Sequence, residues 1–94
     1  MNRPIMFEDE ISDRLRDLRH GDKIIIHHGD TTETLSCYES AIYEDGIVSP
    51  FRRFETAHGS FVDHITERLY DYLENGCDVI AVIGGTEEPF CPWN

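Results

Sequence analysis

Apolar side chains recur with helical spacing near the start of the chain. They are separated by four, four and three residues, which places them on one face of a helix. Acidic residues occupy the first turn of this segment and arginines stand near its end, as the helix dipole favours, and Gly21 can end it. The pattern predicts an amphipathic helix over residues 7–19, after a lead-in over residues 1–6. Its apolar face consists of Phe7, Ile11, Leu15 and Leu18.

Alternating and β-branched residues then predict strands. Residues 23–28 form a β-branched run that ends at a Gly-Asp turn, with Ile24 and Ile26 on one face and Ile25 and His27 on the other. Residues 31–43 are rich in Thr, Tyr and Ile, but their alternation is imperfect. A β-bulge between Cys37 and Ala41 would restore the regular alternation of side chains between the two faces of the strand.

A hairpin is predicted where Glu44-Asp45-Gly46 separates this strand from Ile47-Val48. Pro50 interrupts the third strand, because proline lacks the N–H group that a central strand needs. We expect only a weak continuation, to Glu55, at the edge of a sheet.

The second helix is predicted from another four-residue repeat. Ser60 can cap it, Asp63 stands at the capping-box position, and Gly76 would stop it. The continuous apolar run over residues 79–83 is typical of a strand that is covered on both faces or lies centrally in a sheet. Residues 86–94 are expected to be irregular. The apolar face of the helix consists of Phe61, Ile65, Leu69 and Leu73.

The element order α-β-β-β-α-β indicates an α+β fold. We expect a small, mostly antiparallel sheet with two helices packed on one face, and pairing between the first and last strands. No repeat, low-complexity segment or linker divides the chain, so residues 1–94 are interpreted as a single acidic domain.

The first five elements, over residues 7–75, resemble the double-stranded-RNA-binding domain in their α-β-β-β-α order. The resemblance implies RNA binding through a lysine-rich start to the second helix. The corresponding segment here, residues 59–68, carries Asp63, His64 and Glu67 before its single basic residue, Arg68. The residues that would bind RNA are therefore missing, and the function is not carried over.

Acidic residues dominate the charge of the chain. It has 19 acidic and 8 basic residues and a formal net charge of −11. Lys and Arg are absent between Lys23 and Arg52 and again after Arg68, so a phosphate-tracking surface is not expected there. The short Arg52-Arg53 cluster is the exception. The acidity favours either solubility or an acidic face that binds a basic partner.

Cysteine and histidine provide no recognisable site. The three cysteines lack C-x-x-C spacing and the start of the chain lacks an apolar signal core, which indicates a reduced, cytoplasmic protein. The apolar run 79–83 is too short to span a membrane. Adjacent His27 and His28 would point to opposite faces of a strand. We therefore expect no metal and no cofactor, and no nucleophile motif supports catalysis by Cys37 or Cys91.

The C-terminal segment combines proline with large aromatic side chains. Two interpretations remain open: Phe90 and Trp93 cover the core of their own chain, or they anchor another chain. Gly84-Gly85 is followed by two glutamates and no lysine, so a phosphate loop is not expected.

The leading hypothesis is a non-enzymatic acidic interaction domain that binds a basic protein surface, such as that of a nucleic-acid-binding protein. Small acidic inhibitors carried by phages and mobile elements, including anti-CRISPR proteins, are similar in size and charge. The alternative is a small enzyme or metal-binding domain that uses His and Cys. Homodimerisation through an uncovered sheet face or an edge strand is also open. The candidate partner-binding residues are Asp30, Glu33, Glu44, Asp45, Asp71, Glu74, Glu87, Glu88, Phe90 and Trp93.

Overall fold

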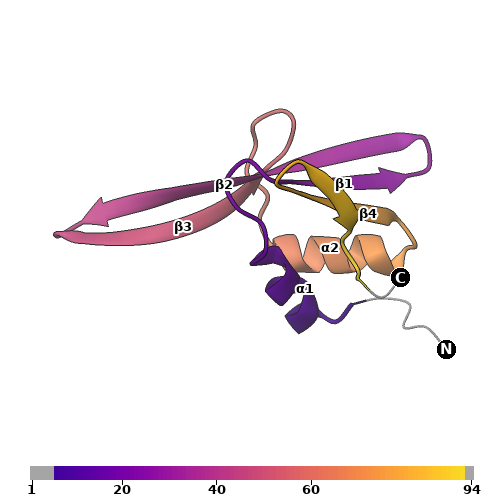
Figure 1. Cartoon of the computed structure of the whole chain (residues 1–94), viewed down its shortest axis with the longest axis horizontal. Coiled ribbons are helices and arrows are strands. Elements are labelled where there is room, and N and C mark those ends of the chain that lie inside the picture. Colours follow the sequence, from indigo (N-terminus) through magenta and orange to yellow (C-terminus); the bar gives the residue numbers. More distant parts are fainter. Residues whose placement is uncertain (1–5, 93–94) are drawn as a thin grey trace.

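The chain folds into one five-stranded antiparallel sheet with two helices (Figure 1). The computed structural model describes residues 6–92. The strand order across the sheet is β3-β2-β1-β4-β5. The α+β class predicted from the sequence is therefore confirmed. The elements are α1 (Glu8–Leu15), β1 (Lys23–His28), β2 (Thr31–Glu44), β3 (Ile47–Glu55), α2 (Ile65–Glu74), β4 (Asp78–Ile83) and β5 (Thr86–Pro89).

β1 lies at the centre of the sheet. It pairs with β2 on one side and with β4 on the other, which confirms the expected pairing of the two most apolar strands. Ile24 and Ile26 are fully buried, whereas Ile25 is half-buried and His27 is exposed, as the alternation predicts. The segment expected to be irregular begins with a further strand, because Thr86–Pro89 pairs with β4. That part of the prediction is wrong.

The core lies between the sheet and the helices. Both helices lie below the sheet in the view of Figure 1. Alternate residues of β1, β2 and β4 are buried on the core side, and Met6, which was expected in a lead-in, is buried with them. The other buried residues are Ile11, Leu15, Leu18, Ile24, Ile26, Leu35, Cys37, Phe54, Leu69, Leu73, Val79, Ala81, Phe90 and Cys91.

The hairpin of β2 and β3 projects well beyond this core. β1 pairs only with residues 31–36 of β2, so the outer parts of β2 and β3 pair with each other alone. The molecule consequently measures 51 Å along its longest axis and 28 and 24 Å along the others. We call residues 39–52 the arm; it extends to the left in Figure 1. Asp45 and Gly46 form its two-residue turn with positive φ angles of 52° and 78°, which confirms the predicted hairpin.

The register of the arm corrects two expectations. Pairing runs without interruption from Ser36 opposite Glu55 to Glu44 opposite Ile47, so the described hairpin has no bulge. Pro50 lies within β3, opposite Ala41, and does not interrupt it. An edge strand tolerates proline where its missing N–H group would point away from the sheet. The predicted edge position of β3 is confirmed.

The first helix is shorter than predicted. α1 ends at Leu15, and three successive backbone hydrogen bonds that span three residues tighten the chain over residues 16–18. This tightened turn still directs Leu18 into the core, where it is fully buried. Phe7 precedes the helix and is 62% exposed, so its predicted place on the buried face is wrong.

The second helix begins later than predicted. The amide of Val62 donates a hydrogen bond to the carbonyl of Phe54 at 2.8 Å, which holds this segment against the edge of β3. α2 therefore starts at Ile65, after His64 with a positive φ angle of 54°, and Ser60 does not cap it. Phe61 lies outside the helix and is 46% exposed. Leu69 and Leu73 are buried, as expected.

Candidate functional site

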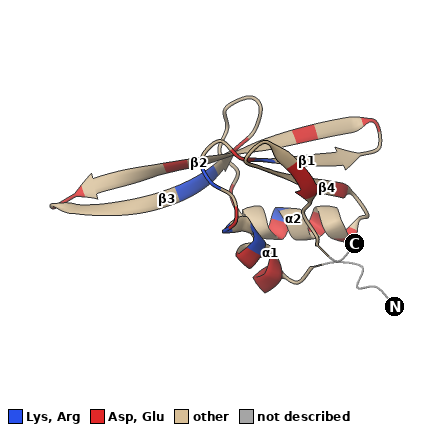
Figure 2. Ribbon diagram, viewed as in Figure 1, with Lys and Arg blue, Asp and Glu red and all other residues tan. Residues whose placement is uncertain are grey.

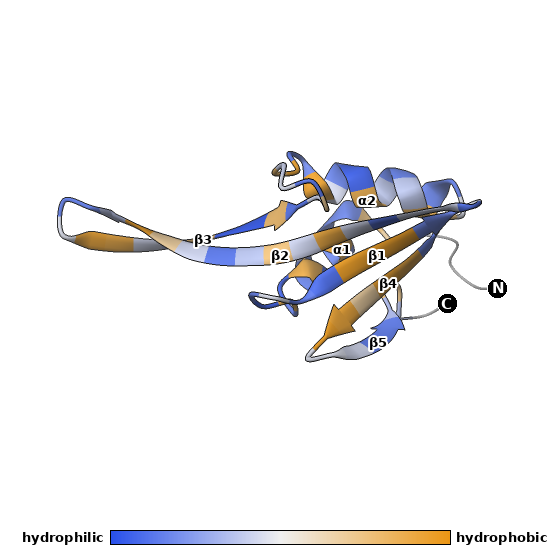
Figure 3. Cartoon of the chain, turned by 90° about the horizontal axis from the view of Figure 1, so that it is seen from above, coloured by the Kyte–Doolittle hydropathy of each residue, from blue (hydrophilic) through white to orange (hydrophobic). Residues whose placement is uncertain are grey.

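The outer half of the arm exposes large apolar side chains. In Figure 3 the end of the arm carries hydrophobic residues although no other element of the described chain covers it. An isolated pair of strands is only marginally stable in water. This exposed tip is therefore unusual for a small acidic domain. The residues and their exposed fractions are Ile42 48%, Tyr43 74%, Ile47 65% and Val48 58%.

The two faces of the arm differ in composition. Residues that are opposite each other in the hairpin share a face. One face of the arm continues the face on which Cys37 and Phe54 are buried. It carries three further pairs of opposite residues, of which the first is charged and the other two are apolar. From the base of the arm to its tip they are Glu39 with Arg52, Ala41 with Pro50, and Tyr43 with Val48.

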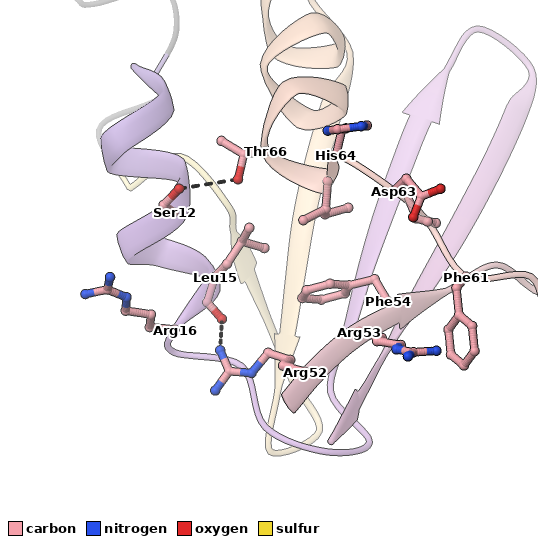
Figure 4. Close-up of a pocket in the computed structure, with 12 residues that line it drawn as sticks. Ser12, Leu15, Arg16, Arg52, Arg53, Phe54, Phe61, Asp63, His64 and Thr66 are labelled. Atoms are coloured by element: carbon pink, nitrogen blue, oxygen red, sulfur yellow. Dashed lines mark hydrogen bonds between the residues drawn. The ribbon is translucent and has the colours of Figure 1, made fainter. Parts of the chain in front are cut away.

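Arginines surround the base of the arm. A recess of about 630 Å³ lies between α1, β3 and the start of α2, and Figure 4 shows the residues that line it. Arg52 donates a hydrogen bond to the carbonyl of Leu15 at 2.7 Å and pairs with Glu39 at 3.1 Å. Arg53 lies over the rings of Phe51 and Phe61. Much of the Arg52-Arg53 cluster is thus engaged within the fold.

A neighbouring recess of about 430 Å³ brings three arginines together, and we call it the arginine groove. It is lined by Arg16, Arg19 and Arg52, with Pro50 and Phe51 on its arm side, and also by Glu39, which pairs with Arg52 at 3.1 Å and with Arg19 at 4.0 Å. The side chains of Arg16 and Arg19 are 78% and 69% exposed. In Figure 2 basic residues are coloured on β3 and near the end of α1, in a ribbon that otherwise carries mostly acidic residues.

A recess of opposite charge lies at the other edge of the sheet. We call it the acidic recess; it has a volume of about 290 Å³ and is lined by Asp78, Ile80, Glu87, Glu88 and Pro89. Ile80 and Pro89 are opposite each other on β4 and β5. Among the described residues, neither Asp78 nor Glu87 forms an ion pair. The recess therefore combines an apolar floor with unpaired carboxylates.

Glu88 is instead neutralised by Arg14. This arginine pairs with Glu88 at 2.6 Å and with Asp17 at 2.9 Å, and its Nε donates to the carbonyl of Phe90 at 3.0 Å. Burial alone would lower the pKa of Arg14, but its hydrogen bonds to the two carboxylates outweigh that effect and raise it. Arg14 therefore attaches the end of β5 to α1.

The predicted acidic residues do not converge on one face. Asp30 and Asp45 lie in the turns at opposite ends of β2, which at about 3.3 Å per residue puts them roughly 45 Å apart. Glu33 is engaged on the core side, where it accepts a hydrogen bond from Tyr72 at 2.5 Å and pairs with Arg68 at 2.9 Å. The exposed members are Asp30, Glu44, Asp45, Asp71, Glu74 and Glu87.

The aromatic candidates have separate outcomes. Phe90 is fully buried, which confirms for this residue the interpretation that the C-terminal segment covers the core. It is therefore not available as a surface anchor. Trp93 lies outside the described residues.

The cysteines and histidines do not assemble into a metal cluster within residues 6–92. Burial raises the pKa of Cys37, and Cys91 is equally enclosed, whereas Cys77 is partly exposed. His27 lies within 3.1 Å of the Thr32 hydroxyl, and the ring of His28 stacks on Tyr72. In the same part of the chain, neither helix is long and apolar enough to cross a membrane.

Sequence reasoning missed the exposed apolar tip of the arm. Tyr43, Ile47 and Val48 were interpreted only as strand residues. The available indication was a mismatch in length: β2 has 14 residues and β1 has 6, so much of β2 could not pair with β1. Asp78 and Ile80 were likewise considered only as an acidic residue in a cation-free stretch and as part of an apolar strand.

Comparisons with known proteins provide no family for this chain: no protein-family model, curated protein or solved structure matches it.

Proposed function

We propose that the chain is a non-enzymatic interaction domain that binds a basic surface of another protein at the acidic recess. The observation that carries this proposal is the pair of unpaired carboxylates, Asp78 and Glu87, beside the apolar floor formed by Ile80 and Pro89. Lysine and arginine side chains combine an apolar stem with a charged head. Such a side chain can pack its stem on the floor and direct its charged head toward either carboxylate, because Asp78 and Glu87 lie on opposite sides of the Ile80–Pro89 pair.

The surroundings of the recess favour the same kind of ligand. The sequence contains no Lys or Arg after Arg68, so the chain supplies no cation of its own from β4 or β5. Arg14 reaches this edge, but it is held by Glu88, Asp17 and two backbone carbonyls. Asp71 and Glu74, which are exposed on α2 just before β4, add negative charge on the helix side of the sheet.

A nucleic-acid-binding protein is the partner class that this chemistry fits best. Its phosphate-binding surface presents the clustered Lys and Arg that the acidic recess and the charge of −11 would attract. Binding there would exclude nucleic acid, so the domain would act as an inhibitor or nucleic-acid mimic, as some phage and mobile-element anti-defence proteins do. Added DNA or RNA should then compete with the domain for its partner.

Affinity capture with two matched baits tests the proposal. The test variant is Asp78→Asn/Glu87→Gln, and the control is Asp63→Asn/Glu67→Gln, which changes the net charge equally at another surface. We expect basic proteins to bind the unmodified domain and the control, to be lost at high salt, and to bind the test variant at least about tenfold more weakly. Equal binding to both variants would show that only net charge matters and would refute a site at the recess.

A further inference from the structure

The sheet has a second face, which the described helices leave uncovered. Side chains alternate between the two faces of a strand, and those of Ile24, Val79 and Ala81 are buried in the core with the helices. Ile25 and Ile80 therefore point to the opposite face, where they are only half-buried. Figure 3 looks onto this opposite face, and no helix of the described chain lies in front of β1, β4 or β5. We call it the open face.

The open face carries a band of apolar residues one helix wide. The strand register places Ile25, Ile80 and Pro89 in one row across β1, β4 and β5, and Val82 lies beside this row on β4. At a strand spacing of about 4.8 Å the row is roughly 10 Å wide. An α-helix with its side chains is about 10–12 Å across. The band ends at β2, where the residues of this face that are paired with β1 all carry hydroxyl groups: Thr32, Thr34 and Ser36.

Two carboxylates without ion pairs among the described residues stand at opposite ends of the band. Asp78 begins β4, and Glu87 on β5 lies opposite Val82. Because four residues separate Asp78 from Val82 on β4, the carboxylates are roughly 13 Å apart along the strands. The other titratable side chains that β1, β4 and β5 place on this face are Lys23 and His27, and both belong to β1. The negative charges therefore lie along β4 and β5.

We propose that the basic partner presents an amphipathic helix, which lies along β4 and β5 on the open face. The inference rests on the proposed function, because it uses the two carboxylates of the acidic recess. Positions i, i+3, i+4 and i+7 of a helix share one face. Apolar residues at i+3 and i+4 pack on Ile80 and Pro89, and Lys or Arg at i and i+7 reach Asp78 and Glu87. Seven residues of helix rise about 10.5 Å, and the long stems of the basic side chains cover the remaining distance.

The open face suits a helix better than other occupants. An extended peptide adds to a sheet at its edge, through backbone hydrogen bonds, whereas a face is covered by helices or by a second sheet. A second sheet would need an apolar surface wider than this band. A second copy of the chain would bring another net charge of −11 against the same carboxylates, which repulsion disfavours.

Three synthetic peptides of about 18 residues test the proposal, since shorter helices are marginal in water. The matched peptide is alanine-based, with lysine at i and i+7 and leucine at i+3 and i+4. The shifted peptide has the same composition, but its second lysine stands at i+5 and so points away from the shared face. The extended peptide carries lysines four residues apart in a valine- and proline-containing sequence that does not form a helix. Circular dichroism verifies the helicity of each.

Fluorescence anisotropy of the labelled peptides with the full chain gives the dissociation constants. The matched peptide should bind at least about tenfold more tightly than either of the others. Asp78→Asn/Glu87→Gln should abolish this preference. The control Asp63→Asn/Glu67→Gln should retain it. Lys23→Gln should bind the matched peptide at least as tightly as the unmodified chain, because Lys23 lies on β1, beside the path of the helix.

Equal affinity for the matched and shifted peptides, or a preference for the extended peptide, would overturn the helix. Affinity capture separates this failure from that of the proposed function. Basic proteins that still bind in a manner that depends on Asp78 and Glu87 would leave the proposed function standing with a different recognition element. Peptides and basic proteins that all ignore these two residues would overturn both proposals.

Discussion

The hydroxyl group of Tyr72 on α2 donates a 2.5 Å hydrogen bond to the carboxylate of Glu33 on β2. The same carboxylate pairs with Arg68, whose guanidinium group lies 5.8 Å from the centre of the Tyr72 ring. Residues 39 positions apart in the sequence thus attach the second helix to the sheet. Glu33, one of the predicted partner-binding residues, therefore makes a contact within the fold.

Tyr72→Phe should lower the free energy of unfolding by about 1 kcal/mol, because it removes this hydrogen bond and retains the ring. Tyr70→Phe is the matched control: it deletes a hydroxyl group from the same helix that makes no such bond among the described residues, and should have a smaller effect. Urea unfolding measures both. Equal losses would show that the Tyr72 hydroxyl contributes nothing specific.

The stability difference between the unmodified chain and Tyr72→Phe should also depend on pH. Burial and the hydrogen bond to Glu33 raise the pKa of Tyr72 above its ordinary value of 10.0. The protonated phenol is therefore the form that the fold favours. Its contribution is complete below pH 10 and is lost as pH rises through the folded-state pKa. Urea unfolding between neutral and strongly alkaline pH should show the two proteins converging, whereas a constant difference would contradict this reasoning.

Arg14→Ala should lower the free energy of unfolding by about 2 kcal/mol, since it leaves Glu88 and the Phe90 carbonyl without their donor. Arg14→Lys should recover little, because an ammonium group cannot reproduce the fork of hydrogen bonds. Arg16→Ala, two residues away and highly exposed, is the control and should change stability by less than about 0.5 kcal/mol in dilute protein. Full recovery with lysine would show that charge alone matters.

Thiol labelling should distinguish the cysteines. Cys37 and Cys91 are buried and burial raises the pKa of Cys37, so both should react slowly with a thiol reagent at pH 8. Cys77 is partly exposed and should react first. Mass spectrometry after a short exposure identifies the modified residue, and denatured protein should label at all three. Early modification of Cys37 would contradict its place in the core.

Hydrogen exchange should separate the arm from the body. In dilute protein, amides near the tip, over residues 42–49, should exchange roughly 100-fold faster than those of Ile24 and Ile26, because no third strand or core supports them. Strong protection of the arm at high dilution would show that the hairpin is stable by itself.

The sequence predicted the parts of the fold whose causes are local. The β-branched run around Ile25, the Asp45-Gly46 turn and the stop at Gly76 follow from neighbouring residues alone. The buried face of α2 was also evident at Leu69 and Leu73. The length of the first helix was not, because the tightened turn at residues 16–18 buries Leu18 at a spacing that an α-helix also allows.

The remaining differences depend on contacts between distant residues. Val62 is bonded to Phe54, which delays the start of α2, and nothing in the local pattern of residues 60–65 reveals this bond. The arm is exposed because β1 begins at Lys23, opposite Ser36, while β2 continues to Glu44, which is a property of pairing rather than of either strand. Glu87 was identified as a candidate from charge alone, but its position beside Ile80 and Pro89 depends on β5, which was not predicted.

The acidic recess is best tested by mapping the bound surface directly. Nuclear magnetic resonance of the isotope-labelled domain, titrated with its captured basic partner, should show the largest amide shifts at Asp78, Ile80, Glu87 and Glu88. The same titration of Asp78→Asn/Glu87→Gln should show these shifts strongly reduced. Shifts confined to the arm or to the arginine groove, with the acidic recess unchanged, would contradict the proposed function.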